Sequence, residues 1–114
     1  MVKVAFLSSL LEGCSCGIVT IDVYGKIVLF NKAAEEMLGL RSERVVGRSI
    51  GVIEPFSALK EVLERGKSRL NARVEVGFST FMVGMSPVVE EGKVVGAVAV
   101  FQDVTEFCKM ANEL

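Results

Sequence analysis

Few side chains in this sequence could do chemistry, and histidine is absent from all 114 residues. Of the three cysteines, Cys14 and Cys16 are separated by one residue and could give two thiolates to a metal ion. Only the distant Cys108 could add to that coordination shell, so we favour a simpler interpretation, two small thiols at a helix–strand junction. The odd number of cysteines also argues against a disulfide framework.

Motifs for catalysis are missing as well. The sequence has no histidine base, no glycine-rich phosphate loop, no Gly-x-Ser-x-Gly elbow and no carboxylate pair at a plausible active site. We interpret Glu35–Glu36 as the solvated face of a helix and Glu90–Glu91 as the tip of a hairpin. We therefore expect no enzymatic activity, no catalytic residue and no bound metal.

Composition and charge fit a single small domain with its own core. Apolar residues make up 51% of the chain and the formal net charge is −1. Basic residues do not cluster, which argues against a nucleic-acid partner, and no apolar run approaches the roughly 20 residues that span a bilayer. The first residues resemble a signal peptide only superficially, because Glu12 interrupts the apolar run and no cleavage site follows. We expect a cytoplasmic location and no membrane partner.

Hydrophobic periodicity predicts an α+β domain with an antiparallel sheet. Residues 3–12 have the spacing of an amphipathic helix. Asn31 and Gly39 are placed to begin and end a short helix, and Gly25 suits the tight turn between the first two strands. Strands are expected at residues 17–23, 27–30, 68–76, 78–89 and 93–102, and helices at 32–38, 41–44 (a single turn), 55–65 and from 104 onward.

The last quarter of the chain joins a strand directly to an amphipathic helix. The strand at 93–102 shows almost no polar alternation, so both of its faces should be covered. Asp103 is expected to accept a hydrogen bond from the backbone N–H three residues on, and Glu106 to reach back to the cap. The apolar residues of this helix have the spacing of a coiled-coil seam: Val104, Phe107, Ala111 and Leu114. A core strand that runs into an outgoing helix is the layout of a module that transmits a signal.

Three segments, in order along the chain, resemble the PAS family. Residues 17–39 resemble its opening hairpin and first helix, residues 45–50 its next turn, and residues 85–106 its closing hairpin with an Asp-x-Thr exit motif. The resemblance implies a five-stranded antiparallel sheet in the order 2-1-5-4-3, with short helices on one face and amphipathic helices at both ends. It also implies a sensory and dimerisation module of a longer bacterial regulator, such as a histidine kinase or a transcription activator. On this basis the chain divides into an N-terminal helix (1–12), a PAS core (13–103) and the start of a signalling helix (104–114).

The resemblance also bears on cofactors, because PAS domains can hold haem, flavin or a small metabolite between the helices and the sheet. A haem held by histidine is excluded, since the chain has none, and a cysteine-adduct flavin is excluded because residues 46–55 contain no cysteine. A non-covalent flavin, or a haem held by cysteine or methionine, stays open as a lower-ranked alternative. The methionines that could approach such a cavity are Met37, Met82 and Met85.

Side-chain alternation divides the last strand into two faces. By analogy with the family, Val95, Ala97, Ala99 and Phe101 should face the helices, whereas Val94, Val98 and Val100 should face outward. Two alanines on the inner face leave volume, which either a filled core or a small apolar ligand would occupy. The candidates for filling or lining that space are Thr20, Phe30, Asn31, Met37, Phe56, Arg73, Met82, Met85, Ala97, Ala99 and Phe101, with Ser79 and Ser86 as further polar groups.

The outer face of the sheet predicts an interface, because monomers rarely leave a contiguous apolar patch exposed. Either the N-terminal helix covers it within one chain, or two chains bury it as a homodimer. The candidate interface residues are Val4, Leu7, Leu11, Val98, Val100 and Phe107. The primary hypothesis is a sensory relay to a C-terminal effector, in which Asp103, Thr105 and Glu106 form the signal exit. The alternative is a purely structural dimerisation domain with a filled core and no ligand.

Overall fold

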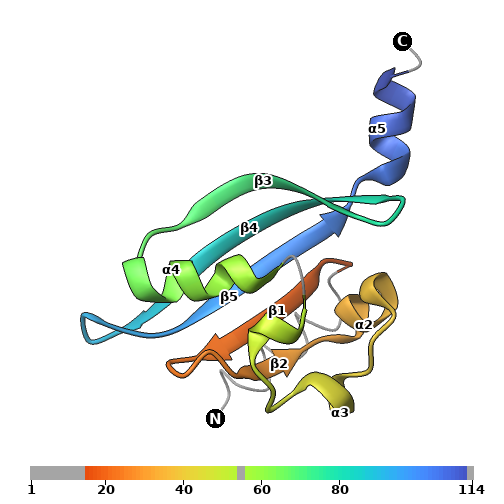
Figure 1. Cartoon of the computed structure of the whole chain (residues 1–114). Coiled ribbons are helices and arrows are strands. Elements are labelled where there is room, and N and C mark those ends of the chain that lie inside the picture. Colours follow the sequence, from red (N-terminus) through yellow and green to blue (C-terminus); the bar gives the residue numbers. More distant parts are fainter. Residues whose placement is uncertain (1–14, 54–55, 113–114) are drawn as a thin grey trace.

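One antiparallel sheet organises the domain, and the computed structural model describes residues 15–53 and 56–112. Its strand order is β2-β1-β5-β4-β3, which confirms the order implied by the PAS resemblance (Figure 1). The elements in chain order are β1 (Gly17–Asp22), β2 (Ile27–Phe30), α2 (Lys32–Leu38), α3 (Ser42–Val45), η1 (Ile50–Val52), η2 (Phe56–Ala58), α4 (Leu59–Arg65), β3 (Arg69–Val76), β4 (Ser79–Glu90), β5 (Lys93–Asp103) and α5 (Thr105–Asn112).

Two tight turns set the strand pairing. Between β1 and β2, the Asp22 carboxylate accepts from the N–H groups of Tyr24 (2.9 Å) and Lys26 (3.0 Å), while Gly25 has the positive φ that the turn requires. Between β4 and β5, Glu91 and Gly92 both have positive φ, the pattern of a type I′ hairpin turn. The central strands β1 and β5 are therefore each held next to a hairpin partner and against each other.

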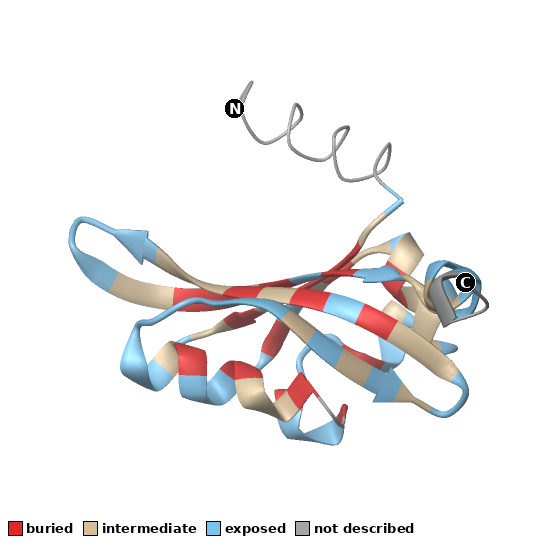
Figure 2. Ribbon diagram, turned by 90° about the horizontal axis from the view of Figure 1, so that it is seen from above, coloured by how far each residue is buried: buried red, intermediate tan, exposed pale blue. Residues whose placement is uncertain are grey.

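Short helices cover one face of the sheet (Figure 2). Asn31 caps the start of helix α2 and Gly39 its end, as predicted, and Gly66 caps the end of α4 in the left-handed conformation. The helix expected over 55–65 begins as the 3₁₀ turn η2 at Phe56 and continues as α4, with Pro55 outside the described residues. These helices and the inner face of the sheet enclose the core.

Strand β5 contains an irregularity that the alternation did not predict. Val88 of β4 pairs with Gly96 of β5, but the next residue, Val89, pairs with Val94. Val95 is therefore the extra residue of a β-bulge in β5. Because a bulge reverses the alternation beyond it, Val94 points toward α4, and its Cγ2 lies 3.5 Å from where a Cβ on Gly66 would be. The outward orientation expected for Val94 was therefore wrong.

The predictions for the first residues fall outside the part of the chain that the structure describes: the helix at 3–12, its face Val4, Leu7 and Leu11, and Cys14. Among the helices in residues 15–53 and 56–112, none is both long enough and apolar enough to cross a membrane.

Candidate functional site

The junction between β5 and α5 is held by hydrogen bonds to the neighbouring strand β4. The N–H of Val104 donates to the Thr80 carbonyl (2.8 Å), and the N–H of Thr80 donates to the Thr105 hydroxyl oxygen (2.9 Å). Both backbone groups of Thr80 are thus used to hold the start of the outgoing helix. We call Thr80, Asp103, Val104 and Thr105 the exit junction.

Asp103 stabilises the exit junction in a way that differs from the predicted cap. Its Oδ1 accepts from the N–H of Thr105 (2.9 Å) and from the Thr105 hydroxyl (2.5 Å), so the bond reaches two residues on rather than three. The difference arises because β5 continues through Asp103 and α5 begins only at Thr105. Glu106 is exposed and makes no hydrogen bond to any described residue, so the predicted reciprocal cap was wrong.

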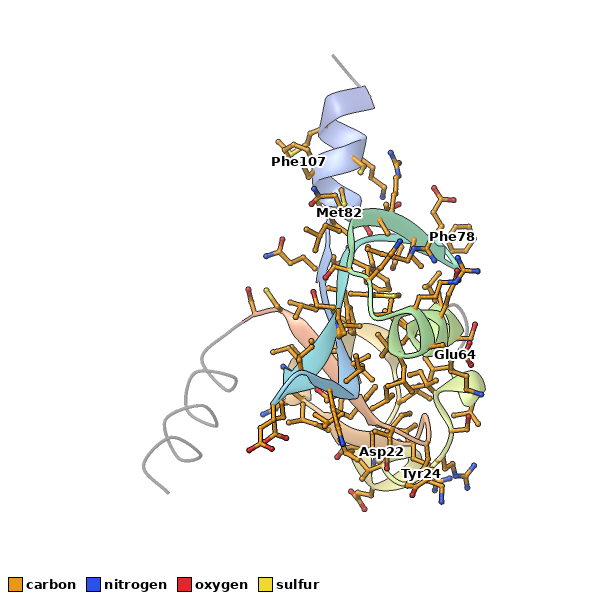
Figure 3. All side chains as sticks on the ribbon, turned by 90° about the vertical axis from the view of Figure 1, so that its left-hand side faces the viewer. Asp22, Tyr24, Glu64, Phe78, Met82 and Phe107 are labelled. Atoms are coloured by element: carbon orange, nitrogen blue, oxygen red, sulfur yellow. The ribbon has the colours of Figure 1, made fainter. Side chains whose placement is uncertain are left out.

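Helix α5 projects from the end of the sheet (Figure 1), and part of its apolar surface is exposed. Phe107 is 72% exposed and Met110 is 64% exposed, one turn apart on the helix. Phe107 is drawn in Figure 3 as a side chain standing away from α5. Of the seam predicted from Val104 onward, the side chain of Ala111 and the whole of Leu114 lie outside the described residues.

Most of the predicted pocket candidates come together in one buried cluster. The Phe101 ring lies 4.8 Å from the Phe56 ring and 5.8 Å from the Phe81 ring, measured between centroids. The candidates in or packed against this cluster are Phe30, Met37, Phe56, Met85, Ala97, Ala99 and Phe101. Three aromatic rings, from β4, β5 and η2, thus belong to the same buried cluster as the two alanines.

Besides Asn31, three pocket candidates do not reach the cluster. Met82 is 38% exposed, and it pairs across the ladder with Arg73, which is also exposed. Met82 and Met85 are three residues apart on a regular strand, so they cannot share a face, and Met85 is the buried one. Thr20 lies between two buried residues of β1 and therefore points to the outer face, where it pairs with Val98.

Sequence reasoning missed Phe81. This residue is buried on the inner face of β4, where the pocket prediction had placed its neighbour Met82. Strict alternation from Met85 through Val83 would have found it, because those two and Phe81 are the buried residues of β4. Placing Met82 inward was the error that hid this residue.

Asn31 is a structural tie rather than part of a pocket. Its Oδ1 accepts from the N–H of Ala34 and of Ile18, each at 2.9 Å, and its Nδ2 donates to the Cys16 carbonyl at 3.0 Å. The side chain thus caps α2 and also fixes that helix to the first residues of β1. All three bonds are internal to the fold.

The outer face of the sheet carries an apolar strip along its centre. Val100 is 40% exposed and pairs with Ile18 on one side and Gly84 on the other, and Leu70 lies over Gly84. Val98, one step along β5, is half-buried. Val98 and Val100 face outward, as the alternation predicts.

Two hollows of about 430 Å³ each lie on the surface and are open to solvent. The first is bordered by the β1–β2 turn, α4 and Val94, and the labelled side chains Tyr24 and Glu64 mark its region in Figure 3. The second lies beside α2, where Glu35 is not simply solvated, because its carboxylate accepts from the N–H of Ser42 (2.7 Å). None of the buried cluster residues lines either hollow.

The inner cluster offers a haem or a flavin no charged partner, because no polar or charged side chain is buried among residues 15–53 and 56–112. Three rings lie in this cluster, and of the methionines Met85 is buried there whereas Met82 faces away. Gln102 on β5 is exposed and donates to the Cys16 sulfur (3.3 Å). Within the described residues, no group of three histidine, cysteine or acidic side chains is placed to hold a metal ion.

The geometry is that of a small α+β module whose central strand leads into a projecting helix. The family described as PAS fold matches residues 5–104. The chain belongs to the PAS family.

Curated relatives of this chain are sensor kinases. It is 37% identical over 98 residues to the probable C4-dicarboxylate sensor kinase of Bacillus subtilis, covering 86% of this chain and 18% of that protein. It is 33% identical over 114 residues to the sensor protein CitS of Halalkalibacterium halodurans, covering 98% of this chain and 20% of that protein. The chain therefore spans about a fifth of the length of the curated relatives it matches.

Solved structures agree with the fold. Histidine kinase ThkA, in complex with the response regulator protein TrrA, matches with a TM-score of 0.75 and 27% identity, covering 85% of this chain and 31% of the other. A PAS domain from Colwellia psychrerythraea matches with a TM-score of 0.71 at 18% identity, covering 91% of this chain and 98% of the other, and supports the fold alone. The chain is thus a PAS sensory domain similar to those of sensor histidine kinases.

Proposed function

We propose that this domain is the relay of a longer sensor histidine kinase and passes a change in its own packing to a C-terminal effector through α5. The exit junction carries the proposal. Both backbone groups of Thr80 hold the start of α5, so a movement of β4 relative to β5 would also move the outgoing helix. The exposed side chains of Phe107 and Met110 give that helix an apolar surface with which to engage the effector or a second copy of the domain.

The input in this proposal is the state of a neighbouring domain or subunit rather than a ligand in the core. The aromatic cluster occupies the inner space, and no charged side chain is buried within residues 15–53 and 56–112. A C4-dicarboxylate, which the names of two relatives mention, would need buried cationic or hydrogen-bonding partners there. Any recognition of such an acid is therefore assigned to other parts of a longer protein.

The proposal includes a homodimer in the cytoplasm, with the domain regulating rather than catalysing. An apolar strip on the outer sheet face supports the dimer, because Val100 remains 40% exposed beside Ile18 and Val98. Phe107 would extend the interface along α5, where it would contact the α5 helix of the second chain. Because α5 is only about two turns long, this helix pair would need a continuing helix of the effector to be stable.

The test replaces the matching segment of the Bacillus subtilis sensor kinase with this chain and compares variants of the chimera. Asp103→Ala removes the acceptor for both Thr105 groups, at a cost of about 0.5–2 kcal/mol, so the domain should stay folded. We expect the autophosphorylation rate to change by about five-fold or more, the size of ordinary allosteric coupling. Asp103→Asn, which keeps an acceptor oxygen, is the matched control and should change the rate less. An autophosphorylation rate unaffected by Asp103→Ala would refute the relay.

A further inference from the structure

The start of β1, where the chain enters the sheet, lies beside the end of β5, where the chain leaves it. Gly17, the first residue of β1, pairs directly with Phe101 on β5. On the other face, the Cys16 sulfur accepts a hydrogen bond from Gln102 (3.3 Å). Phe101 and Gln102 are the two residues immediately before Asp103, so the start of the sheet contacts β5 just ahead of the exit junction.

Glycine at position 17 is required by the position of the Phe101 ring. A Cβ on Gly17 would lie 2.4 Å from both Cε2 and Cζ of that ring and 2.9 Å from Cε1, closer than real Cβ atoms approach other groups. The ring therefore lies over the glycine backbone, an arrangement in which an aromatic side chain covers a cross-strand glycine. Phe101 is fully buried, so its ring has little free space into which to move.

The ring lies between the start of the sheet and the exit junction. Phe81, whose ring centroid is 5.8 Å from that of Phe101, comes directly after Thr80 in β4 and pairs with Asp103. A displaced Phe101 ring would press on Phe81, and so on the strand whose Thr80 backbone holds Thr105. Two connections thus run from Phe101 to the exit junction, one along β5 and one across to β4.

We infer that Gly17 and Phe101 form a positioning pair that sets the geometry of the exit junction. A shift of the chain where it begins β1 would tilt the Phe101 ring and alter the hydrogen bonds between Thr80 and Thr105. This inference rests on the proposed function for its biological output, because α5 is there the route to the effector. The coupling from Gly17 to Thr105 is itself a property of the 114-residue chain and is measured on that chain.

The experiment compares glycine-to-alanine variants of the whole chain by amide hydrogen exchange and NMR. Gly17→Ala should displace the ring and raise exchange at the Thr80 and Thr105 amides by about five-fold or more over the wild type, beyond any uniform change across the sheet. Gly84→Ala is the matched control on β4, because a Cβ there would make only an ordinary contact, 3.9 Å from Leu70. It should leave both exit amides unchanged.

A second variant separates the ring from general damage. Gly17→Ala combined with Phe101→Leu removes the ring carbons that the new methyl would meet, and should return exchange at Thr80 and Thr105 toward that of Phe101→Leu alone. Gly96→Ala serves as the contrasting case, since its Cβ would lie 2.4 Å from the Ile21 carbonyl oxygen, a backbone group that Phe101→Leu cannot relieve. Rescue of Gly17→Ala but not of Gly96→Ala by Phe101→Leu supports the pair.

The inference is overturned if exchange at Thr80 and Thr105 in folded Gly17→Ala matches that of Gly84→Ala. If Gly17→Ala does not fold, the single variant Phe101→Leu provides the test. It should change hydrogen exchange at the Thr80 and Thr105 amides relative to the wild type, and unchanged exchange at both overturns the inference. Kinase output in the chimera is measured separately. Altered exit amides with unaltered autophosphorylation would support the positioning pair and count against the proposed function.

Discussion

Two of the strands in this domain run directly into helices, and the two junctions are built differently. At the start of α2, Asn31 uses both ends of its amide: Oδ1 accepts from Ala34 and Ile18, and Nδ2 donates to Cys16. At the start of α5, the Asp103 carboxylate accepts from the N–H and the hydroxyl of Thr105, two residues on. Two bonds connect this junction to another strand: the Thr80 N–H donates to the Thr105 hydroxyl oxygen, and the Val104 N–H donates to the Thr80 carbonyl.

The two helices also differ in how much of their apolar surface is buried. Helix α2 buries Ala34 completely, and its Met37 and Leu38 pack against the core. Helix α5 leaves Phe107 and Met110 largely exposed. A strand-to-helix junction thus gives a fixed cover where the cap reaches a neighbouring strand and the helix has core contacts. It gives a projecting helix where those core contacts are missing, so that α5 is connected to the sheet mainly through its bonds to Thr80 of β4.

The largest effect is expected at the α2 junction. Asn31→Ala should lower the free energy of unfolding by about 2–4 kcal/mol, because it removes a helix cap, the acceptor for the Ile18 N–H and the side-chain donor to the Cys16 carbonyl. Denaturant unfolding followed by circular dichroism measures this loss. Asn31→Asp keeps the acceptor and loses only the donor, so it should fall between alanine and wild type. A loss under about 0.5 kcal/mol in the alanine variant would mean that α2 is no better fixed than α5.

A smaller and more local effect is expected at the exit junction. Thr105→Val keeps the shape of the side chain but removes the acceptor for the Thr80 N–H, and should cost about 1 kcal/mol. Hydrogen exchange should speed up at Thr80 and in α5, while the amides of β1 and α2 keep their protection. Thr105→Ser, which retains the hydroxyl, is the control. Equal loss of protection throughout the sheet would show that α5 is part of the same cooperative unit as α2.

The sequence predicted the local cap of the α2 junction but not its bonds to residues distant in the chain. Asn31 before a short amphipathic run and Gly39 after it predicted the cap and both ends of the helix. The bonds from Asn31 to Ile18 and Cys16 join residues 13 and 15 positions apart, and such pairings depend on tertiary structure that local patterns do not encode. The tie between Thr80 and Thr105, across 25 positions, was out of reach for the same reason.

Two errors in the sheet had local signals that could have been used. Gly96 inside an apolar strand often marks a bulge or a close backbone approach, and here a Cβ would meet the Ile21 carbonyl oxygen at 2.4 Å. That signal pointed to the irregularity that turns Val94 toward α4. The inward placement of Met82 contradicted the period of two set by Met85, and Phe81 took the position instead. The strand order itself came from the resemblance to PAS domains, since strand alternation does not specify which strands are neighbours.

The smallest effect on stability is expected from the exposed surface of α5. Phe107→Ser should change the free energy of unfolding of the monomer by no more than about 0.5 kcal/mol, because the side chain is 72% exposed and leaves little buried area when removed. In the proposed dimer the same side chain is buried, so the substitution should weaken self-association, measured by sedimentation equilibrium over a range of concentrations. Lys109→Ser, another change to serine on α5 but at an exposed polar position, is the control and should leave self-association unchanged. If Phe107→Ser destabilises the monomer as strongly as Asn31→Ala, then α5 is packed like α2 and the contrast between the two junctions does not hold.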